Sequence, residues 1–381
     1  MVAMVAMVGD ALRFYGWAVI AEGKNCDNVY WGSGDRQMAA EQRQLKRAVL
    51  WAPGPERQVR CFLCNWRCLI AGGKLGHCAV RKNIDGVLYS LVYDRVCAAN
   101  DDPIEKKPLF HFQPGTRSFS VSTPGCNFRC GFCQNWRISQ IAAGAIEGEP
   151  YSPRQLVTAA ERSGCSSIAY TYTEPTIFME LCAETGRLAR ERGLANVFVS
   201  NGYMTTEAID FARPWLDGIN IDLKAFTEDY YKRLCAARLA PVLETIRYIA
   251  KNTNIWMELT TLIVPGENDS DEELKRIAGF ISNEASVDVP WHVSRFYPNY
   301  EMDDKPPTPA ATLQRALDIG KAAGLRYVYV GNLPGAEAES TFCYNCGELL
   351  INRVGYTIRS NIIKGSACPA CNAQIAGVGL G

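Results

Sequence analysis

From residue 117 to residue 331, short apolar runs alternate with longer stretches in which apolar residues recur at the spacing of a helix. The runs predict strands at 117–122, 167–172, 196–201, 218–224, 255–264, 290–296 and 325–331. Helices are predicted between them, at 153–163, 175–192, 205–212, 227–234, 241–253, 270–284 and 309–323. Consecutive strand–helix units specify a parallel sheet, so the pattern predicts an α/β fold with a full or partial TIM-like (β/α) barrel, and we favour the partial barrel.

The stretches on either side of this region have a different character. A Cys-rich segment precedes it, in which Asp85-Gly86 predicts the tight turn of a hairpin. We divide the chain into a poorly constrained N-terminal extension, a Cys-rich domain with its linker, the barrel and a zinc-ribbon-like domain, at 1–41, 42–115, 116–332 and 333–381.

The balance of charge and the lengths of the apolar segments indicate which classes of partner to exclude. The 381 residues include 40 basic and 40 acidic side chains, so no overall field attracts nucleic acid or an anionic membrane. The apolar start of the chain lacks a basic region before it, and no segment has the 18 or so apolar residues of a membrane-spanning helix. We therefore expect a cytoplasmic protein with no nucleic acid and no membrane among its partners.

Cysteine usage indicates metal chemistry. Eleven of the sixteen cysteines fall into three tight clusters, and a reducing cytosol disfavours disulfides. In the tail, "CYNCG" and "CPAC" place two CxxC pairs 21 residues apart, which predicts a closed four-thiolate zinc site with a rubredoxin-like iron as the alternative. Its ligands would be Cys343, Cys346, Cys368 and Cys371.

The N-terminal cluster, "CFLCNWRC" with the following "GHC", leaves its metal open. Its spacing matches no standard pair of zinc knuckles, so structural zinc, an auxiliary [4Fe–4S] cluster and an unliganded state remain as alternatives. The four thiols belong to Cys61, Cys64, Cys68 and Cys78.

The central cluster, "TPGCNFRCGFCQNW", has three thiols and no fourth nearby. It follows the first predicted strand, and the loops after the strands carry the active sites of such folds. One alternative is a structural zinc completed by a distant residue. The other is a [4Fe–4S] cluster in which one iron stays open to bind a substrate or cofactor. The three thiols are those of Cys126, Cys130 and Cys133.

At these residues the sequence resembles the radical S-adenosylmethionine (SAM) superfamily, whose signature is Cx3CxΦC with an aromatic residue at Φ, here Phe132. The resemblance implies an oxygen-sensitive enzyme in which the open iron of the [4Fe–4S] cluster chelates SAM. Reductive cleavage of SAM then gives a 5′-deoxyadenosyl radical that removes hydrogen from a substrate. It also implies that Phe132 packs near the adenine.

Finer features resemble the pyruvate formate-lyase-activating-enzyme branch. "YTEP" stands where the superfamily carries GGEP, "SNG" resembles TNG, "DLK" resembles the DLK of the branch, and "WHVSRF" places a histidine near SAM. The SAM-contacting residues implied by this match are Glu174, Asn201, Asp222, Lys224 and His292. Simpler alternatives are a helix cap for the glutamate, a surface ion pair for the aspartate and lysine, and a satisfied core histidine.

From about residue 42 onward, "DPIEKKPLFHFQPG" and "AYTYTEPTIF" resemble the radical SAM component of the AmmeMemoRadiSam system. That resemblance implies Memo-type and AMMECR-type partner proteins, with ferredoxin or flavodoxin as generic electron donor. The substrate is then an unidentified small molecule or peptide, or alternatively a glycine of a partner protein. A non-catalytic metal-binding scaffold is the alternative from another class. Lys106 and Lys107 are expected on a solvated face, and His111 in packing.

Overall fold

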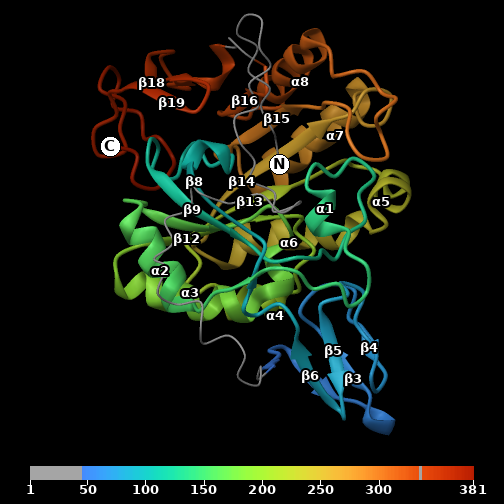
Figure 1. Ribbon diagram of the computed structural model, residues 1–381. Coiled ribbons are helices and arrows are strands. Elements are labelled where there is room, and N and C mark those ends of the chain that lie inside the picture. Colours follow the sequence, from blue (N-terminus) through green and yellow to red (C-terminus); the bar gives the residue numbers. More distant parts are fainter. Residues whose placement is uncertain (1–44, 334–336) are drawn as a thin grey trace, which may run out of the picture.

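An eight-stranded sheet forms the centre of the structure, a computed structural model that describes residues 45–333 and 337–381 (Figure 1). Its strand order is β16-β15-β14-β13-β12-β11-β9-β8. The seven strands from β9 to β16 in this order are mutually parallel, and β8 pairs antiparallel with β9. The bounds are β8 Ala98–Pro103, β9 Arg117–Ser122, β11 Ser167–Tyr170, β12 Ala195–Ser200, β13 Gly218–Asp222, β14 Trp256–Ile263, β15 Trp291–Arg295 and β16 Val328–Gly331.

The parallel α/β fold predicted from the sequence is confirmed. Each predicted strand of 117–331 has its counterpart in this sheet. Because β8 and β16 are the two edges, pairing between the described strands does not close the sheet into a barrel.

The predicted N-terminal extension, 1–41, lies outside the described residues.

Helices connect the parallel strands, as the periodicity predicted. The helix α2 shows the local reasons: Ser152 and Gln155 form a capping box, and Pro153 occupies the first turn. The helices are α1 Trp136–Ser139, α2 Pro153–Arg162, α3 Met179–Glu191, α4 Thr206–Ala212, α5 Glu228–Cys235, α6 Leu239–Asn252, α7 Asp271–Phe280 and α8 Ala310–Ala322. Short helical turns are η1 Pro55–Arg57, η2 Ile104–Lys106, η3 Pro175–Phe178, η4 Ile281–Ala285 and η5 Glu337–Glu339.

The linker between β8 and β9 packs against side chains of the sheet. The backbone N–H groups of Phe110 and His111 donate to the carboxylate of Glu258 on β14, at 3.0 and 2.7 Å. Asn220 on β13 donates to the carbonyl of Pro108 at 2.8 Å. The linker thus joins the edge strand β8 to the central strands β13 and β14.

The Cys-rich N-terminal segment forms two small sheets that project from one end of the molecule, blue in Figure 1. The predicted hairpin at Asp85-Gly86 is confirmed, because β5 and β6 pair antiparallel across this turn. The strands are β1 Lys46–Arg47, β2 Trp51–Pro53, β3 Val59–Cys61, β4 Leu69–Ile70, β5 Arg81–Ile84 and β6 Val87–Ser90, and β7 Arg95–Val96 pairs with β10 Glu149–Pro150 outside them.

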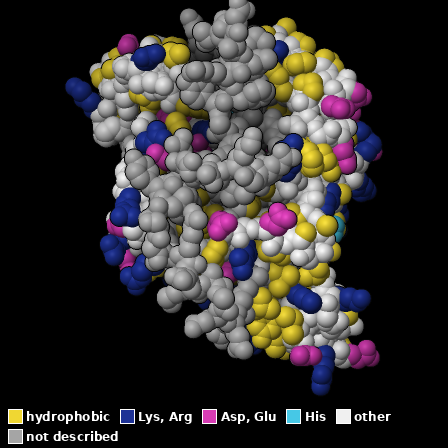
Figure 2. Space-filling view, in the orientation of Figure 1, with side chains coloured by type: hydrophobic (Ala, Val, Ile, Leu, Met, Phe, Trp, Pro, Cys, Tyr) yellow, Lys and Arg dark blue, Asp and Glu magenta, His cyan; other side chains and the backbone are white. Residues whose placement is uncertain are grey.

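The tail forms a third small sheet, red in Figure 1, with β17 Thr341–Phe342, β18 Leu349–Val354 and β19 Thr357–Asn361. Within 45–333 and 337–381, no helix combines the length and apolar character that crossing a membrane requires. Basic and acidic side chains are interspersed over the described part of the face in Figure 2, which agrees with the balanced composition.

Candidate active site

The three central cysteines lie on the loop that leaves the carboxyl end of β9. Cys130 is buried, whereas Cys126 and Cys133 are partly exposed. The backbone N–H of Phe128 approaches the Cys126 sulfur at 3.4 Å. Burial, followed by the nearby Glu174 charge, raises the pKa of the Cys126 thiol well above its ordinary value, so metal binding must displace a proton there.

Glu174 and Asn201, from the ends of β11 and β12, meet beside this loop. One carboxylate oxygen of Glu174 accepts from the backbone N–H of Thr176 at 3.0 Å and from the Ser200 hydroxyl at 2.9 Å. The other accepts from the backbone N–H of Asn201 at 2.8 Å. Glu174 therefore caps the turn η3, the simpler of its two predicted roles, and it also fixes the position of Asn201.

Asn201 extends the contact to the cysteine loop. Its side-chain Nδ2 donates to the Asn127 Oδ1 at 2.7 Å and lies 3.9 Å from the Cys126 sulfur. The turn that follows it requires Gly202, whose φ is +70° and whose added Cβ would stand 2.7 Å from Ile221. The "SNG" segment is thus held against the first cysteine of the loop.

Asp222 and Lys224 form an ion pair at 2.9 Å, as the alternative interpretation of their spacing predicted. The pair does not lie on an open surface, because its side chains are only 19% and 12% exposed. The Lys224 ammonium lies 5.6 Å from the centroid of the Phe132 ring. Burial would lower the Lys224 pKa, but the charges of Asp222, Cys130 and Cys235 raise it well above its usual value.

A second contact joins the cysteine loop to "YTEP". The Asn135 side chain donates to the Tyr172 carbonyl at 2.9 Å. Tyr172 has a φ of +64°, a left-handed conformation that a residue with a side chain rarely adopts. The phenol of Tyr172 donates to Asp102 at 2.5 Å. Tyr172 thus adopts a left-handed backbone conformation at the position where the GGEP motif of the superfamily has a glycine. The hydrogen bond from its hydroxyl to Asp102 holds the side chain in place.

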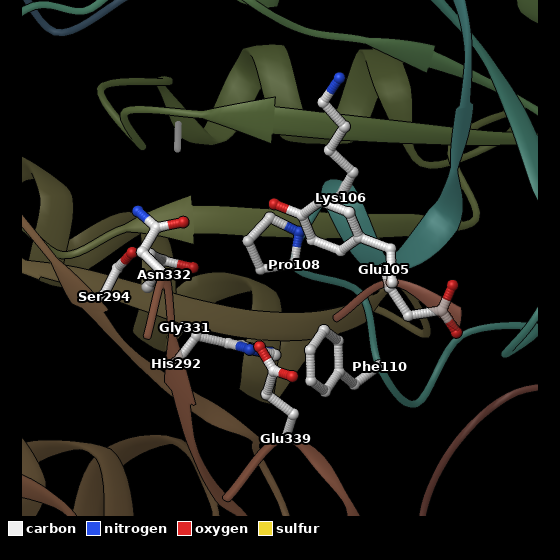
Figure 3. Close-up of a pocket in the computed structure, with 11 residues that line it drawn as sticks. Glu105, Lys106, Pro108, Phe110, His292, Ser294, Gly331, Asn332 and Glu339 are labelled. Carbon is white, nitrogen blue, oxygen red and sulfur yellow. The ribbon is translucent and has the colours of Figure 1, made fainter. Parts of the chain in front are cut away.

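His292 lies apart from the cysteine loop, in a pocket shown in Figure 3. Its Nε2 is 2.7 Å from the Glu258 Oε2, and its ring stands edge-on to Phe110 at a centroid distance of 4.8 Å. The sheet register aligns Asp222, Thr260 and His292 on three neighbouring strands, so their side chains share one face of the sheet. His292 therefore has a buried hydrogen-bond partner in Glu258, and it also lines the pocket.

The pocket is bordered by the linker, the ends of β14 to β16 and the tail domain. Its lining consists of Glu105, Lys106, Pro108, Phe110, Thr260, His292, Ser294, Gly331, Asn332, Glu339 and Tyr356. Two of its buried polar atoms, the Ser294 Oγ and the Glu105 Oε2, have no hydrogen-bond partner among the described residues. Figure 3 shows the Lys106 side chain extending away from the other labelled side chains. Unpaired buried polar atoms are costly, so this pocket is suited to water or to a polar group that pairs with them.

The expectation that Lys107 faces solvent is wrong. Its side chain is 1% exposed and pairs with Asp102 at 2.7 Å. Lys106 pairs with the other oxygen of Asp102 at 2.8 Å and remains partly exposed. Burial lowers the Lys107 pKa to about 8, although Asp102 opposes this shift. His111 agrees with its packing interpretation, because its ring nitrogens lie 2.7 Å from the Ala376 carbonyl and 2.6 Å from the Tyr329 hydroxyl.

The tail cysteines converge on one point. The ligand atoms of Cys343, Cys346, Cys368 and Cys371 all lie within 4.8 Å of one another. Two of the sulfur–sulfur distances are 3.6 and 3.7 Å, which suit four thiolates around one tetrahedral ion. The chemistry of this donor set fits the predicted metal site.

The N-terminal and central cysteines are arranged differently. Within 45–333 and 337–381, no other group of three or more His, Cys, Asp or Glu ligand atoms lies within 4.8 Å. Thiolates of an iron–sulfur cluster bind different irons and stand further apart than ligands of a single ion. For Cys126, Cys130 and Cys133, the presence of three thiols on one loop near the Lys224 charge fits a cluster.

Sequence reasoning missed several residues that shape this site. Asn127 and Asn135 lie within the cysteine motif, but only the fold places their side chains against Asn201 and Tyr172. The sequence marks Cys235 as an isolated cysteine to watch, and the fold places it near Cys130, where it is the largest cause of the raised pKa of the Cys130 thiol. Tyr300 stacks on Trp136 at a centroid distance of 5.0 Å. The signal available in the sequence for Asn127 and Asn135 was their place beside the cysteines; Cys235 and Tyr300 lie far along the chain from the motif.

Comparison with known proteins connects this geometry to a family. The sequence profile described as "Radical SAM superfamily" matches residues 120–278. An uncharacterized protein of Methanocaldococcus jannaschii is 44% identical over 335 residues, which cover 87% of this chain and 99% of that protein.

Two further relatives carry functional names. A putative glycyl-radical enzyme activating enzyme of Methanocaldococcus jannaschii is 28% identical over 49% of this chain and 71% of its own length. The pyruvate formate-lyase 1-activating enzyme of Escherichia coli strain K12 is 22% identical over 57% of this chain and 93% of its own length. The chain is thus similar to activating enzymes over about half of its length and to the uncharacterized protein over most of its length.

Proposed function

Because this chain belongs to the radical SAM superfamily, we propose that Cys126, Cys130 and Cys133 hold a [4Fe–4S] cluster with which the protein cleaves SAM reductively. When bound, the cluster supplies the electron that converts SAM to methionine and a 5′-deoxyadenosyl radical, which removes hydrogen from a substrate. The observation that carries this proposal is the single loop that presents three spread thiols beside Asn201 and Lys224.

The chain's own residues hold and shield the cofactors. Lys224 keeps a positive charge near the cysteine loop, since its pKa is raised well above the ordinary value. Phe132 offers its ring beneath that ammonium for the adenine of SAM. Asp222 holds Lys224 in place, and Asn201 presents an amide beside Cys126. Glu174 acts as a positioning residue for Asn201, because both of its oxygens accept hydrogen bonds within the protein.

We place the substrate in the pocket that contains His292. Asp222, which pairs with Lys224, is aligned across neighbouring strands with Thr260 and then with His292, and the last two residues line this pocket. The unpaired Ser294 Oγ supports a polar ligand, a small molecule or a segment of a peptide. In this arrangement His292 contacts the substrate or the part of SAM that faces it.

The test is anaerobic reconstitution with iron and sulfide, followed by dithionite and SAM. Wild-type protein should release 5′-deoxyadenosine, and Cys126→Ala should release none while still binding zinc in the tail. Cys165→Ala is the control, because it removes a thiol that lies outside the three clusters. Failure of the wild-type protein, loaded with its full iron content, to produce 5′-deoxyadenosine would overturn the proposal.

The names of the two activating-enzyme relatives support a second candidate, the formation of a glycyl radical on a partner protein. Paramagnetic resonance of a candidate partner after incubation distinguishes the two, because a stable protein radical and a released product leave different signals. Memo-type and AMMECR-type proteins are the partners to test first, with ferredoxin and flavodoxin as electron donors. A non-catalytic scaffold would retain its metals and release no 5′-deoxyadenosine.

A further inference from the structure

The four N-terminal cysteines are arranged as metal ligands. Burial raises the pKa of the Cys64, Cys68 and Cys78 thiols, and the backbone N–H groups of Trp66, His77 and Val80, respectively, act against that rise. Two of these residues, Trp66 and Val80, stand two positions after their cysteine, the relation that Phe128 has to Cys126. Such donors stabilise thiolates, the form in which cysteine binds metal.

A buried arginine lies beside these thiols with unused donors. Arg81 is 1% exposed, and its Nη2 bonds to Glu180 at 2.5 Å and to the Val49 carbonyl at 2.9 Å. Its Nε and Nη1 have no hydrogen-bond partner among the described residues. Burial would lower the pKa of Arg81, but Glu180 and then the charges of Cys61, Cys78 and Cys64 raise it. The Glu180 Oε2 is unpaired as well, and an acceptor bound among the four thiols would satisfy the two orphaned donors of Arg81.

The spacing of these thiols distinguishes a site for a single metal ion from a site for an iron–sulfur cluster. The tail thiols of this same chain converge within 4.8 Å, as four ligands of one ion do, whereas no three of Cys61, Cys64, Cys68 and Cys78 do so. The wider arrangement suits a cluster whose irons each take one thiolate, and its sulfides are acceptors for the orphaned donors of Arg81.

The site is packed directly against the catalytic loop. The indole N–H of Trp66, which lies between Cys64 and Cys68, donates to the Asn127 carbonyl at 2.8 Å. The guanidinium of Arg129 donates to the carbonyls of Cys126 at 2.7 Å and of His77 at 3.2 Å. Each of these side chains joins a residue next to an N-terminal cysteine to a residue in or next to the central motif.

The contact at Gly125 is equally close. This residue precedes Cys126, has a φ of +98°, and would place an added Cβ 2.7 Å from Val80 and 3.3 Å from the carbonyl of Cys78. A side chain there would separate the two loops. Glycine is the residue that permits both the backbone conformation and the approach.

We propose that Cys61, Cys64, Cys68 and Cys78 hold a second iron–sulfur cluster that relays single electrons to the catalytic site. With four cysteine ligands this cluster has no open iron, so electron transfer is the chemistry left to it. In the step, the N-terminal cluster loses one electron and the catalytic cluster gains one, with no bond made or broken. A low-potential one-electron donor, dithionite in the assay, reduces the N-terminal cluster again. The relay part rests on the proposed function; the metal assignment does not.

The metal assignment is tested on the full chain in which Cys126, Cys130 and Cys133 are replaced by Ala. After anaerobic reconstitution this variant should keep about four irons and matching sulfide, and should show the resonance of a reduced cluster. Adding Cys61→Ala and Cys64→Ala should remove that iron, and Cys165→Ala in the same background should not. Zinc in place of iron, or no metal, at the N-terminal site of the triple variant would overturn the assignment, and this holds even if the further substitutions prevent folding.

The relay is tested by counting electrons. Wild-type protein is reduced, freed of dithionite and mixed with SAM. Two reduced clusters should yield about two molecules of 5′-deoxyadenosine per chain, and Cys61→Ala about one, because each cluster stores one electron. Equal yields would refute the relay while leaving the cluster in place. A triple variant that keeps its iron beside a wild type that cleaves no SAM would instead refute the proposed function.

Discussion

Replacing Glu174 by Gln tests how the fold positions the cysteine-facing amide. The carboxylate accepts from the N–H of Thr176, the N–H of Asn201 and the hydroxyls of Thr176 and Ser200. In Glu174→Gln the oxygen with three donors can remain an oxygen, so the amide NH2 faces the N–H of Asn201. That change removes a charge-assisted hydrogen bond and leaves a buried donor unpaired. We expect a loss of about 2–4 kcal/mol in the free energy of unfolding.

The loss should appear in SAM binding as well as in stability. Asn201 would shift away from Cys126, and each 1.4 kcal/mol of binding lost corresponds to roughly a tenfold change in affinity. The assays are urea unfolding and the SAM concentration that gives half-maximal 5′-deoxyadenosine.

Thr176→Val is the control for this prediction, because it removes one hydroxyl donor and leaves the bond to Asn201. It should cost about 1 kcal/mol and leave the SAM dependence unchanged. If Glu174→Gln stays within about 0.5 kcal/mol of wild type and binds SAM equally well, the carboxylate does not position Asn201.

Three further predictions concern the linker, the tail and the domain contact. Burial lowers the pKa of His111 to about 4, so the unfolded chain takes up a proton below about pH 6.5 that the folded state excludes, and stability should fall by about 2.6 kcal/mol as the pH drops from 6.5 to 4. Urea unfolding of His111→Gln should show a smaller pH dependence; an unchanged slope would mean that this histidine is already charged. Cys346→Ala should lose one equivalent of zinc by metal analysis while the protein keeps its iron, whereas unchanged zinc content would contradict a tail site. Gly125→Ala should lower the free energy of unfolding by about 1–3 kcal/mol, and Val80→Ala in the same chain should restore only part of it, because space returns and the φ strain does not. Full restoration would show that strain is absent.

The strands of the sheet could be predicted because their signal is local. Each parallel strand is a short apolar run followed by a helix, and all seven runs appear in the observed sheet. Strand β8 was missed because "AANDDP" has no apolar alternation, and its place in the sheet depends on pairing with β9. Lys107 was misplaced for the same reason: its partner Asp102 neutralises the charge only once β8 and the turn η2 have formed.

The candidate site divides in the same way. The motif identifies Cys126, Cys130 and Cys133, because the spacing itself carries the chemistry. The roles of Glu174 and His292 depend on partners at Asn201 and Glu258, which are distant in sequence, so the motif could suggest contact with SAM but could not reveal the internal hydrogen bonds.

The open sheet, the linker that packs against it and the His292 pocket are connected through one residue, Glu258. Strand pairing leaves a gap between β8 and β16, and the linker crosses the sheet to meet Glu258 on β14. The Glu258 carboxylate also pairs with His292. One buried charge therefore fixes both the linker and a side chain of the pocket wall. Neighbouring strands lie about 4.8 Å apart, which sets Asp222 and His292 roughly 10 Å from each other across β14. Under the proposed function, that separation would leave room for a nucleoside at Phe132 and Lys224 to meet a substrate beside His292, in a pocket that residues of the linker and the tail also line.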